Sequence, residues 1–343
     1  MNQLRQKIWR ASAPSNIALI KYMGKVDHEN NRPTNSSLSY TLSHLKSVVE
    51  LELVASDSHT EARRADQWEP LKSFEGKALS PIELAGKGRE RFLKHLGRIK
   101  EMYRSHHSFT VRSANDFPAD CGLASSASSF AALTKVALMA LSGLTDGELA
   151  PVEEAADLSR QGSGSSCRSF FTPWSIWDER GARAVPELAH LLFKHQVVVV
   201  DEAKKEVSSS EAHRRVLNST LFVGRPDRAE VRVEDLFKAL AGNDLASAFE
   251  ITWAEFWDMH ALFETSRPSF GYLSEGSLAV LRFVRGESWD KYGRGPLVTM
   301  DAGPNVHLLY AVDDLNKEFM RSFASEVSRH FSTRFRVLSE EWL

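Results

Sequence analysis

Several short stretches of this chain combine residue types that bind phosphate. Residues 117–129 include Pro118, Gly122 and a series of small hydroxyl side chains, and an Ala- and Leu-rich segment, 130–141, follows them. A small-residue loop that opens a helix presents free N–H groups at the positive end of the helix dipole, which suits a phosphate. A buried helix N-terminus capped by serine would have the same composition. The stretch has neither a Walker A ending nor a Gly-x-Gly-x-x-Gly fingerprint.

Two further stretches are rich in hydrogen-bond donors. Residues 21–25 place two lysines and a tyrosine around Gly24, a set that can grip a polyanion, although a solvated turn has the same residues. Residues 159–169 form a glycine/serine loop that contains Arg160 and Arg168, and amides, hydroxyls and guanidinium groups bind oxyanions. A flexible linker is the alternative, but a linker has no need of the two arginines.

Two more stretches complete a set that fits phosphoryl transfer. Residues 204–210 (Lys-Lys-Glu-Val-Ser-Ser-Ser) add donors, or form a polar connection, and residues 301–305 form an acidic turn after a predicted strand. Phosphoryl transfer needs a cradle for nucleotide phosphates, cations for the acceptor, and a carboxylate near the attacking oxygen. The chain has no His-Glu-x-x-His motif, and its twelve histidines form no cluster in the sequence.

Composition narrows the class of protein. With 42% hydrophobic and 26% charged residues, the 343-residue chain is typical of a soluble globular protein of two domains or one large one. The formal net charge of −2 argues against nucleic acid or an anionic membrane as the main partner. Cys121 and Cys167 favour neither a disulfide scaffold nor a metal site. No signal-peptide core or membrane-length apolar run is found, so we expect a cytoplasmic location.

Hydrophobic periodicity predicts the elements that must position these stretches. Strands are predicted at residues 11–20, 47–54, 108–112, 196–200, 296–300, 306–312 and 335–338. Helices are predicted at residues 82–103, 130–141, 146–158, 233–263, 277–286 and 315–331. A boundary after residue 187 would separate an N-terminal nucleotide- and substrate-binding domain, 1–187, from a C-terminal domain, 188–343, that carries the Asp301 turn.

Five segments, in order along the chain, resemble the motifs of diphosphomevalonate decarboxylases, which belong to the galactokinase/homoserine kinase/mevalonate kinase superfamily. They are residues 20–25, 33–39, 115–128, 161–169 and 300–305. The third segment marks only the superfamily, whereas Gly-Ser-Gly-Ser-x-Cys-Arg-Ser and Asp-Ala-Gly-Pro-Asn are much more specific. The resemblance implies an α+β fold, with a ribosomal protein S5 domain 2-like N-terminal domain, a ferredoxin-like C-terminal domain and the active site in the cleft between them. It also implies a homodimer.

The resemblance further implies an ATP-dependent decarboxylation in isoprenoid synthesis, with Mg²⁺, in which 5-diphosphomevalonate becomes isopentenyl diphosphate. By similarity, Asp301 is the catalytic carboxylate beside the 3-hydroxyl, Lys21 keeps it ionised, and Arg168 holds the carboxylate that is lost. The substrate-binding residues implied are Asn16, Tyr22, Met23, Gly24, Lys25, Ser163, Gly164, Ser165, Ser166, Cys167, Ser209 and Ser210. The ATP-binding residues implied are Asn115, Pro118, Gly122, Leu123, Ala124, Ser125 and Ser126. No side chain is assigned to the metal.

The chain departs from the family pattern in ways that bear on the substrate more than on the chemistry. The departures are Met23 in place of Trp, Asp116 in place of Asn, Asp120-Cys121 in place of small residues, and residues 170–174 in place of a glycine-rich continuation. An arginine that the family places on the helix before the central loop has no direct match. We expect Lys87 or Arg89 to substitute for it.

Two other functions stay open at this level. One is a related decarboxylase or kinase acting on phosphomevalonate or mevalonate, and a mevalonate enzyme would not need the diphosphate grip of Tyr22 and Lys25. The other is a non-catalytic nucleotide-binding relative, which would have no use for Lys21, Arg168 and Asp301 together.

Overall fold

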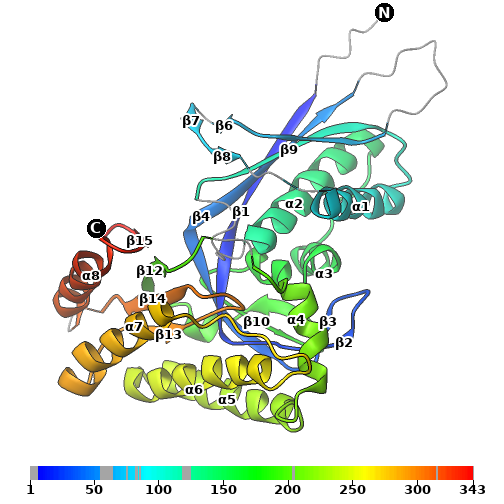
Figure 1. The fold of residues 1–343 in the computed structure, drawn as a ribbon. Helices are drawn as coiled ribbons and strands as arrows, with labels where there is room; N and C mark the ends of the chain where they lie inside the picture. The colour runs from blue at the N-terminus through cyan, green and yellow to red at the C-terminus, as the bar shows by residue number, and fades with distance from the viewer. Residues whose placement is uncertain are drawn as a thin grey trace, which may run out of the picture.

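The computed structural model describes residues 7–54, 65–74, 76–81, 84, 86–117, 125–202, 205–313 and 316–342. Two long paired strands run through its N-terminal domain (Figure 1). Strand β1 (Ile8–Ile20) pairs antiparallel with β4 (Ser37–Leu53) from end to end. The other edge of β4 is shared, because β10 (Trp174–Asp178) pairs with its first residues and β9 (Phe109–Asn115) with its last. The seven-stranded sheet is completed by β5 (Gln67–Pro70), β8 (Ser80–Pro81) and β11 (Gly181–Ala184). Two short hairpins accompany it: β2 (Lys25–Asp27) with β3 (Arg32–Pro33), and β6 (Ser73–Phe74) with β7 (Lys77–Ala78).

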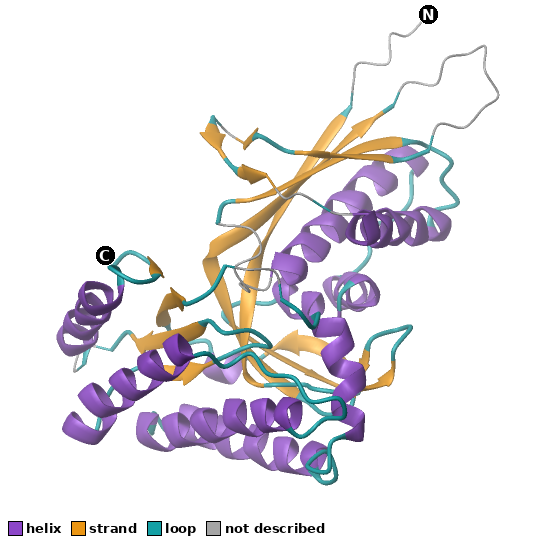
Figure 2. Cartoon of the chain, viewed as in Figure 1, coloured by secondary structure: helices purple, strands orange, loops and turns teal. Residues whose placement is uncertain are grey.

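Three helices cover one face of this sheet (Figure 2). Helix α2 (Ser125–Thr145) packs directly on β1 and β4, and α1 (Gly86–Met102) and α3 (Val152–Gly162) pack beside it. Among the described helices, α2 alone is long and apolar enough to cross a membrane. However, 72% of its apolar window is buried inside the protein, as expected of a core helix. Its small Ala and Ser side chains let the sheet approach closely.

The C-terminal domain is a four-stranded antiparallel sheet with helices. Its strands are β12 (Phe193–Val199), β13 (Leu297–Thr299), β14 (Val306–Ala311) and β15 (Arg336–Ser339), in the spatial order β13-β14-β12-β15. Its helices are α4 (Ser209–Arg215), α5 (Arg225–Ala241), α6 (Leu245–Glu264), α7 (Glu275–Val284) and α8 (Lys317–Phe331). Helices separate β12 from β13 and β14 from β15, which is the β-α-β-β-α-β order of a ferredoxin-like domain. The predicted two-domain α+β fold is therefore confirmed.

Most predicted elements are present with shifted ends, but one prediction is wrong. The helix predicted at 233–263 is two helices, because Asn243 adopts a positive φ of 53° and Asp244 caps α6 by accepting from the Ser247 N–H. The strand predicted at 47–54 is present, but it begins earlier, because β4 starts at Ser37. Apolar spacing alone does not show where a chain reverses direction.

One hydrophobic core spans both domains. It includes Ile17 and Leu19 of β1, Leu38 of β4, and Val298 and Leu308 of the C-terminal sheet, all with at most 1% of their surface exposed. A second core lies between the seven-stranded sheet and α1 to α3. The shared core holds the end of β1 close to the end of β13, where Thr299 Oγ1 donates to the Ala18 carbonyl at 3.2 Å. Lys21 directly follows β1, and Asp301 follows β13 after the buried Met300.

Candidate active site

A cavity of about 660 Å³ lies between the two domains. Residues after β1, helix α1, the start of α2 and the 3-10 helix η1 (Gly164–Phe170) line it from one side, and α4 and the Asp301 turn line it from the other. The described lining contains eight lysines and arginines: Lys21, Lys25, Arg91, Lys94, Arg98, Arg168, Lys205 and Arg214. Its acids are Glu29 and Asp301. Because the whole chain carries a formal charge of −2, this positive charge is local and suits multiply charged anions.

Lys21 and Asp301 form an ion pair that joins the two domains. Lys21 directly follows β1, Asp301 lies two residues after β13, and Lys21 Nζ is 2.6 Å from Asp301 Oδ1. Burial lowers the pKa of the Lys21 ammonium, and the charge of Asp301 opposes that shift. Burial alone would raise the pKa of the Asp301 carboxyl, but positive charge, chiefly that of Lys21, holds this pKa below its ordinary value. The carboxylate is therefore ionised at neutral pH, and its side chain remains 31% exposed.

Arg168 is held in one orientation by both long strands. Its Nε donates to Asn16 Oδ1 of β1 at 3.1 Å, and its Nη1 donates to Ser37 Oγ of β4 at 2.9 Å. Asn16 in turn donates to Ser169 Oγ of η1 at 2.8 Å. The Arg168 guanidinium also lies over the ring of Tyr22, 5.7 Å from its centroid. This arrangement presents a planar, pre-oriented fork suited to a carboxylate.

Tyr22 lies in the cavity lining with its hydroxyl next to η1. Its ring stacks on that of His213, with centroids 4.7 Å apart. A Cβ on Gly164 would lie 2.5 Å from Tyr22 Oη, so only glycine allows this close approach. Burial raises the pKa of Tyr22 to about 12, and the hydroxyl is therefore a hydrogen-bond donor throughout the physiological range.

A row of cations on α1 lies in the cavity lining together with Lys25. Arg91, Lys94 and Arg98 occupy positions i, i+3 and i+7, which share one face of a helix. Burial, followed by the charges of Arg91 and Arg214, lowers the pKa of Lys25 to about 8. Burial is the largest cause of this shift, and the smaller contributions of Arg91 and Arg214 show that these two cations lie close enough to act on Lys25.

We expected Lys87 or Arg89 to replace the arginine that the family places on this helix, but the row of cations on α1 points to Arg91 instead. Neither Lys87 nor Arg89 is among the described lining residues of the cavity. Arg89 instead lies over the ring of Trp68, 5.3 Å from its centroid. Arg91, two positions further along α1, lines the cavity, and its guanidinium lies over the ring of Phe130, 4.9 Å from its centroid. The i, i+3, i+7 spacing of basic residues was the signal in the sequence that could have identified it.

The predicted ATP-binding stretch is described only in part. Residues 118–124 lie outside the described residues. The predicted contacts that fall there are Pro118, Gly122, Leu123 and Ala124. Ser125 and Ser126 open α2 and line the cavity. Asn115 is fully buried at the end of β9 and accepts a hydrogen bond from Ser47 Oγ at 2.7 Å, so it joins β9 to β4.

The predicted substrate-binding residues divide into a lining group and a supporting group. The lining group is Tyr22, Met23, Lys25, Ser163, Gly164, Ser165, Ser209 and Ser210. Asn16, Gly24, Ser166 and Cys167 are not among the described lining residues of this cavity, and direct contact between them and the substrate stays a prediction. A Cβ on Gly24 would lie 2.8 Å from the ring of Phe222, so packing explains this glycine. Ser166 Oγ donates to Ser163 O at 2.6 Å, and burial raises the pKa of Cys167 to about 12, which leaves an inert thiol.

Asp116, which departs from the family pattern, also lies away from this cavity's described lining. Its Oδ1 accepts from the main-chain N–H of Lys46 at 2.7 Å, and its own N–H donates to Lys46 O at 3.0 Å. The extra carboxylate therefore fastens the end of β9 to β4. Asp120 and Cys121 lie outside the described residues.

Two family models together match most of the chain. The diphosphomevalonate decarboxylase-like N-terminal domain matches residues 13–184, and the mevalonate 5-diphosphate decarboxylase C-terminal domain matches residues 196–339. The chain belongs to the diphosphomevalonate decarboxylase family. The predicted domain boundary after residue 187 falls between the two matched ranges and stays a prediction.

Individual members of the diphosphomevalonate decarboxylase family resemble the chain over nearly its whole length. The Candida albicans diphosphomevalonate decarboxylase is 32% identical over 343 residues, which cover 93% of this chain and 87% of the relative. A mevalonate diphosphate decarboxylase structure from Legionella pneumophila is 44% identical with a TM-score of 0.84, and the match covers 97% of this chain and 100% of that one. The structure of MDDEF in complex with MVAPP, AMPPCP and magnesium is 28% identical to this chain, with a TM-score of 0.77. The match covers 98% of this chain and 100% of that one.

Lys205 and His260 contact the turn that carries Asp301. The sequence did not predict either contact. Lys205 Nζ donates to the carbonyl of Ala302, and its positive charge helps to lower the pKa of Asp301. His260 Nε2 lies 3.2 Å from the carbonyl oxygen of Asp301. The sequence marked Lys205 only as one donor in a polar run, because its proximity to residue 301 depends on the fold.

Proposed function

We infer that this protein catalyses the ATP-dependent decarboxylation of (R)-5-diphosphomevalonate to isopentenyl diphosphate, ADP, phosphate and CO₂. The observation that carries the inference is the 2.6 Å Lys21–Asp301 pair in a cationic cavity that Arg168 also lines. The relative MDDEF was solved with MVAPP, AMPPCP and magnesium, which supports the same combination of substrates here.

Asp301 is the proposed base for the first step. As the 3-hydroxyl oxygen attacks the γ-phosphorus of ATP, its proton passes to the Asp301 carboxylate and the bond from phosphorus to ADP breaks. Lys21 offsets the negative charge on the transferring phosphoryl group. In the second step the bond to the carboxylate carbon breaks, its electron pair forms the alkene, and phosphate leaves and takes up the proton held by Asp301.

The proposed substrate contacts follow the charges of the cavity. Arg168, pre-oriented by Asn16 and Ser37, is suited to the carboxylate that is lost as CO₂. Tyr22 and Lys25, supported by the cationic face of α1, are suited to the diphosphate. Lys25 and this row of cations favour the diphosphate over mevalonate itself, since a neutral hydroxyl would leave several buried or crowded cations without a counter-charge.

The edge of the cavity at the start of α2 fits nucleotide phosphates and magnesium. The first N–H groups of a helix have no intrahelical partner, and Ser125 and Ser126 add hydroxyls there. Among the described residues no three acidic, histidine or cysteine side chains cluster as metal ligands. Mg²⁺ is usually held by substrate phosphates, water and one or two protein oxygens, which Ser125 and Ser126 can supply. When bound, the ion neutralises charge on the phosphates.

The test is to offer ATP with mevalonate, its 5-phosphate and its 5-diphosphate, and to measure CO₂ and ADP. We expect equal amounts of CO₂ and ADP from the diphosphate and much slower turnover of the other two. ADP without CO₂ would instead identify a kinase. Preference for the monophosphate would move the protein to the related decarboxylases.

We also propose that the protein is a homodimer, which the family resemblance implies, and that it is located in the cytoplasm, as expected from its sequence. Light scattering of the purified protein should give twice the 38.5 kDa mass of the chain. Cell fractionation tests the location.

A further inference from the structure

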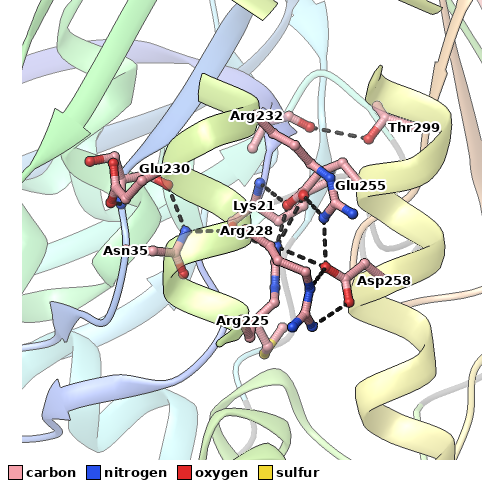
Figure 3. A network of polar contacts seen from close by, with 12 residues as sticks. Lys21, Asn35, Arg225, Arg228, Glu230, Arg232, Glu255, Asp258 and Thr299 are labelled. Atoms are coloured by element: carbon pink, nitrogen blue, oxygen red, sulfur yellow. Dashed lines mark hydrogen bonds and ion pairs between the residues drawn. The ribbon is translucent and has the colours of Figure 1, made fainter. Parts of the chain in front are cut away.

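A network of buried side chains holds the main chain of Lys21 (Figure 3). The Lys21 N–H donates to Glu255 Oε1 at 2.9 Å, and the Lys21 carbonyl accepts from Arg225 Nη2 and from Asn35 Nδ2, both at 3.0 Å. Lys21 lies one residue past β1, where the strand ladder no longer satisfies its main-chain groups. Side chains therefore replace the sheet at this position, and two of the three come from the C-terminal domain.

Glu255 and Arg225 orient each other. Arg225 Nη2 donates to Glu255 Oε1 at 2.5 Å and its Nη1 donates to Oε2 at 3.0 Å, and both side chains are 0% exposed. Arg228 and Arg232 follow Arg225 on one face of α5, and both bind Asp258 of α6. Arg232 also donates to Glu255 Oε2 at 2.9 Å. The network thus joins α5 to α6 and reaches β1 through Lys21.

Stability alone does not explain a fully buried ion pair at this point. Replacing such a pair by apolar side chains of similar volume is often neutral or stabilising. An apolar pair, however, cannot bind the N–H and C=O of Lys21. We propose that Glu255 and Arg225 are positioning residues that fix the main chain of Lys21 so that its ammonium meets Asp301. The kinetic consequences rest on the proposed function, whereas the geometry does not.

The charge of Glu255 acts on Lys21 as well. The charged and titratable groups that act on the Lys21 ammonium, or are acted on by it, come from η1, α6, β14 and the turn after β13. They are Arg168, Glu255, His260, His307 and Asp301. Glu255 and Asp301 are the two that raise the pKa of Lys21 against the effect of burial. Removing the charge of Glu255 should therefore lower this pKa, and Lys21 would lose its proton at a lower pH.

The experiment compares Glu255→Gln with Asp258→Asn. Glutamine retains the shape and one acceptor oxygen, whereas Asp258 belongs to the same arginine network without contacting Lys21. In Glu255→Gln we expect kcat to fall by about 10²-fold, because small misplacement of a catalytic group has that effect. The KM values should change little, and the alkaline limb of the kcat profile should move to lower pH. In Asp258→Asn, kcat and the alkaline limb should stay close to wild type.

A measurement without turnover keeps the two proposals apart. Protein labelled with ¹³C at lysine Cε reports the pKa of Lys21, with the signal assigned by its loss in Lys21→Arg. We expect a lower pKa in Glu255→Gln and an unchanged one in Asp258→Asn. If both variants keep the wild-type pKa and the same kcat, Glu255 is only a packing residue and the inference is wrong. If wild type releases no CO₂, the proposed function fails, and the pKa of Lys21 in Arg225→Lys, a variant that keeps the charge but loses the fork on the Lys21 carbonyl, still tests the positioning role.

Arg225→Lys provides a second variant should Glu255→Gln not fold. It keeps the positive charge but cannot bind Glu255 and the Lys21 carbonyl as a fork. We expect a lower kcat with unchanged KM values and a folded protein by circular dichroism. A wild-type kcat in Arg225→Lys would show that the grip on the Lys21 carbonyl does not matter.

Discussion

Asp301 is an ionised carboxylate because Lys21 lies 2.6 Å from it, and this pairing defines the first prediction. In Asp301→Asn the side chain can neither accept the hydroxyl proton nor pair with the ammonium. We expect kcat to fall by about 10²–10⁴-fold, the range that a general base contributes. ATP affinity, measured by calorimetry with a non-hydrolysable analogue, should change little. Near-normal CO₂ release by this variant would remove Asp301 from the mechanism.

Lys25 titrates in an accessible range, and the sign of its effect is clear. Burial, Arg91 and Arg214 lower its pKa to about 8, so the side chain is charged below that pH and neutral above it. Since kcat/KM reports the free enzyme, kcat/KM for diphosphomevalonate should fall as pH rises through about 8. In Lys25→Arg the guanidinium stays charged, and the decline should move to higher pH. An unmoved decline would assign the titration to another group.

Residue type predicted the reacting groups better than their supports. Lys21, Arg168 and Asp301 stand in specific motifs, and the fold brings them to one cavity. Ser166 and Cys167 stand in the same motif but point away, because a 3-10 helix turns successive side chains to different sides. Glu255 and Arg225 carry no motif and lie 234 and 204 positions from Lys21, so only tertiary structure reveals their contact.

At the scale of elements, the packing of α3 against α2 depends on Gly162. A Cβ at this position would collide with the ring of Phe130 and lie 2.9 Å from His95 Cγ. We expect Gly162→Ala to lower the free energy of unfolding by about 1–3 kcal/mol, as overpacking does. Urea unfolding measures the change.

The matched control for that prediction is Gly143→Ala in α2. A Cβ there would meet no atom within 4 Å, so alanine should raise the free energy of unfolding by about 0.5–1 kcal/mol through its helix propensity. If both variants are stabilised to the same degree, the close contact at Gly162 does not limit packing.

Elements were predictable where one period runs without interruption. The regular strands and helices of the C-terminal domain follow the spacing of their apolar residues. This spacing continues across the break between α5 and α6, so it does not reveal the break. That break depends on Asn243, which tolerates a positive φ, and on Asp244, whose side chain caps the next helix. The basic spacing of Arg91, Lys94 and Arg98 predicts a shared helix face, yet the cavity that this face lines is a property of the assembled fold.

For the molecule as a whole, charge is distributed in a way that composition conceals. The chain has a formal charge of −2, yet the described lining of its cavity is strongly cationic. Such a field raises the local concentration of anionic substrates and weakens as ionic strength increases. The inter-domain core keeps these charges together, since neither domain alone contains Lys21, Arg168 and Asp301.

Buried neutral histidines make the stability of the whole fold depend on pH. Burial lowers the pKa of His95 to about 3 and those of His260 and His307 to about 4, whereas a histidine in the unfolded chain titrates near its ordinary pKa of 6.5. Between these values the unfolded chain binds more protons, so the free energy of unfolding rises with pH and is lost as pH falls from 6.5 toward 4. Each titrating histidine adds a slope of up to about 1.4 kcal/mol per pH unit.

Urea unfolding between pH 4.5 and 7 measures this slope in a range where carboxyl groups contribute least, because their ordinary pKa values lie near 4. His95→Gln removes one titrating group and keeps a polar side chain beside Thr134, with which His95 Nε2 is hydrogen-bonded at 2.8 Å. Its unfolding free energy should therefore depend less steeply on pH than that of wild type. A wild-type stability that does not change over this range would mean that these histidines titrate normally in the folded protein, and that burial does not hold them neutral.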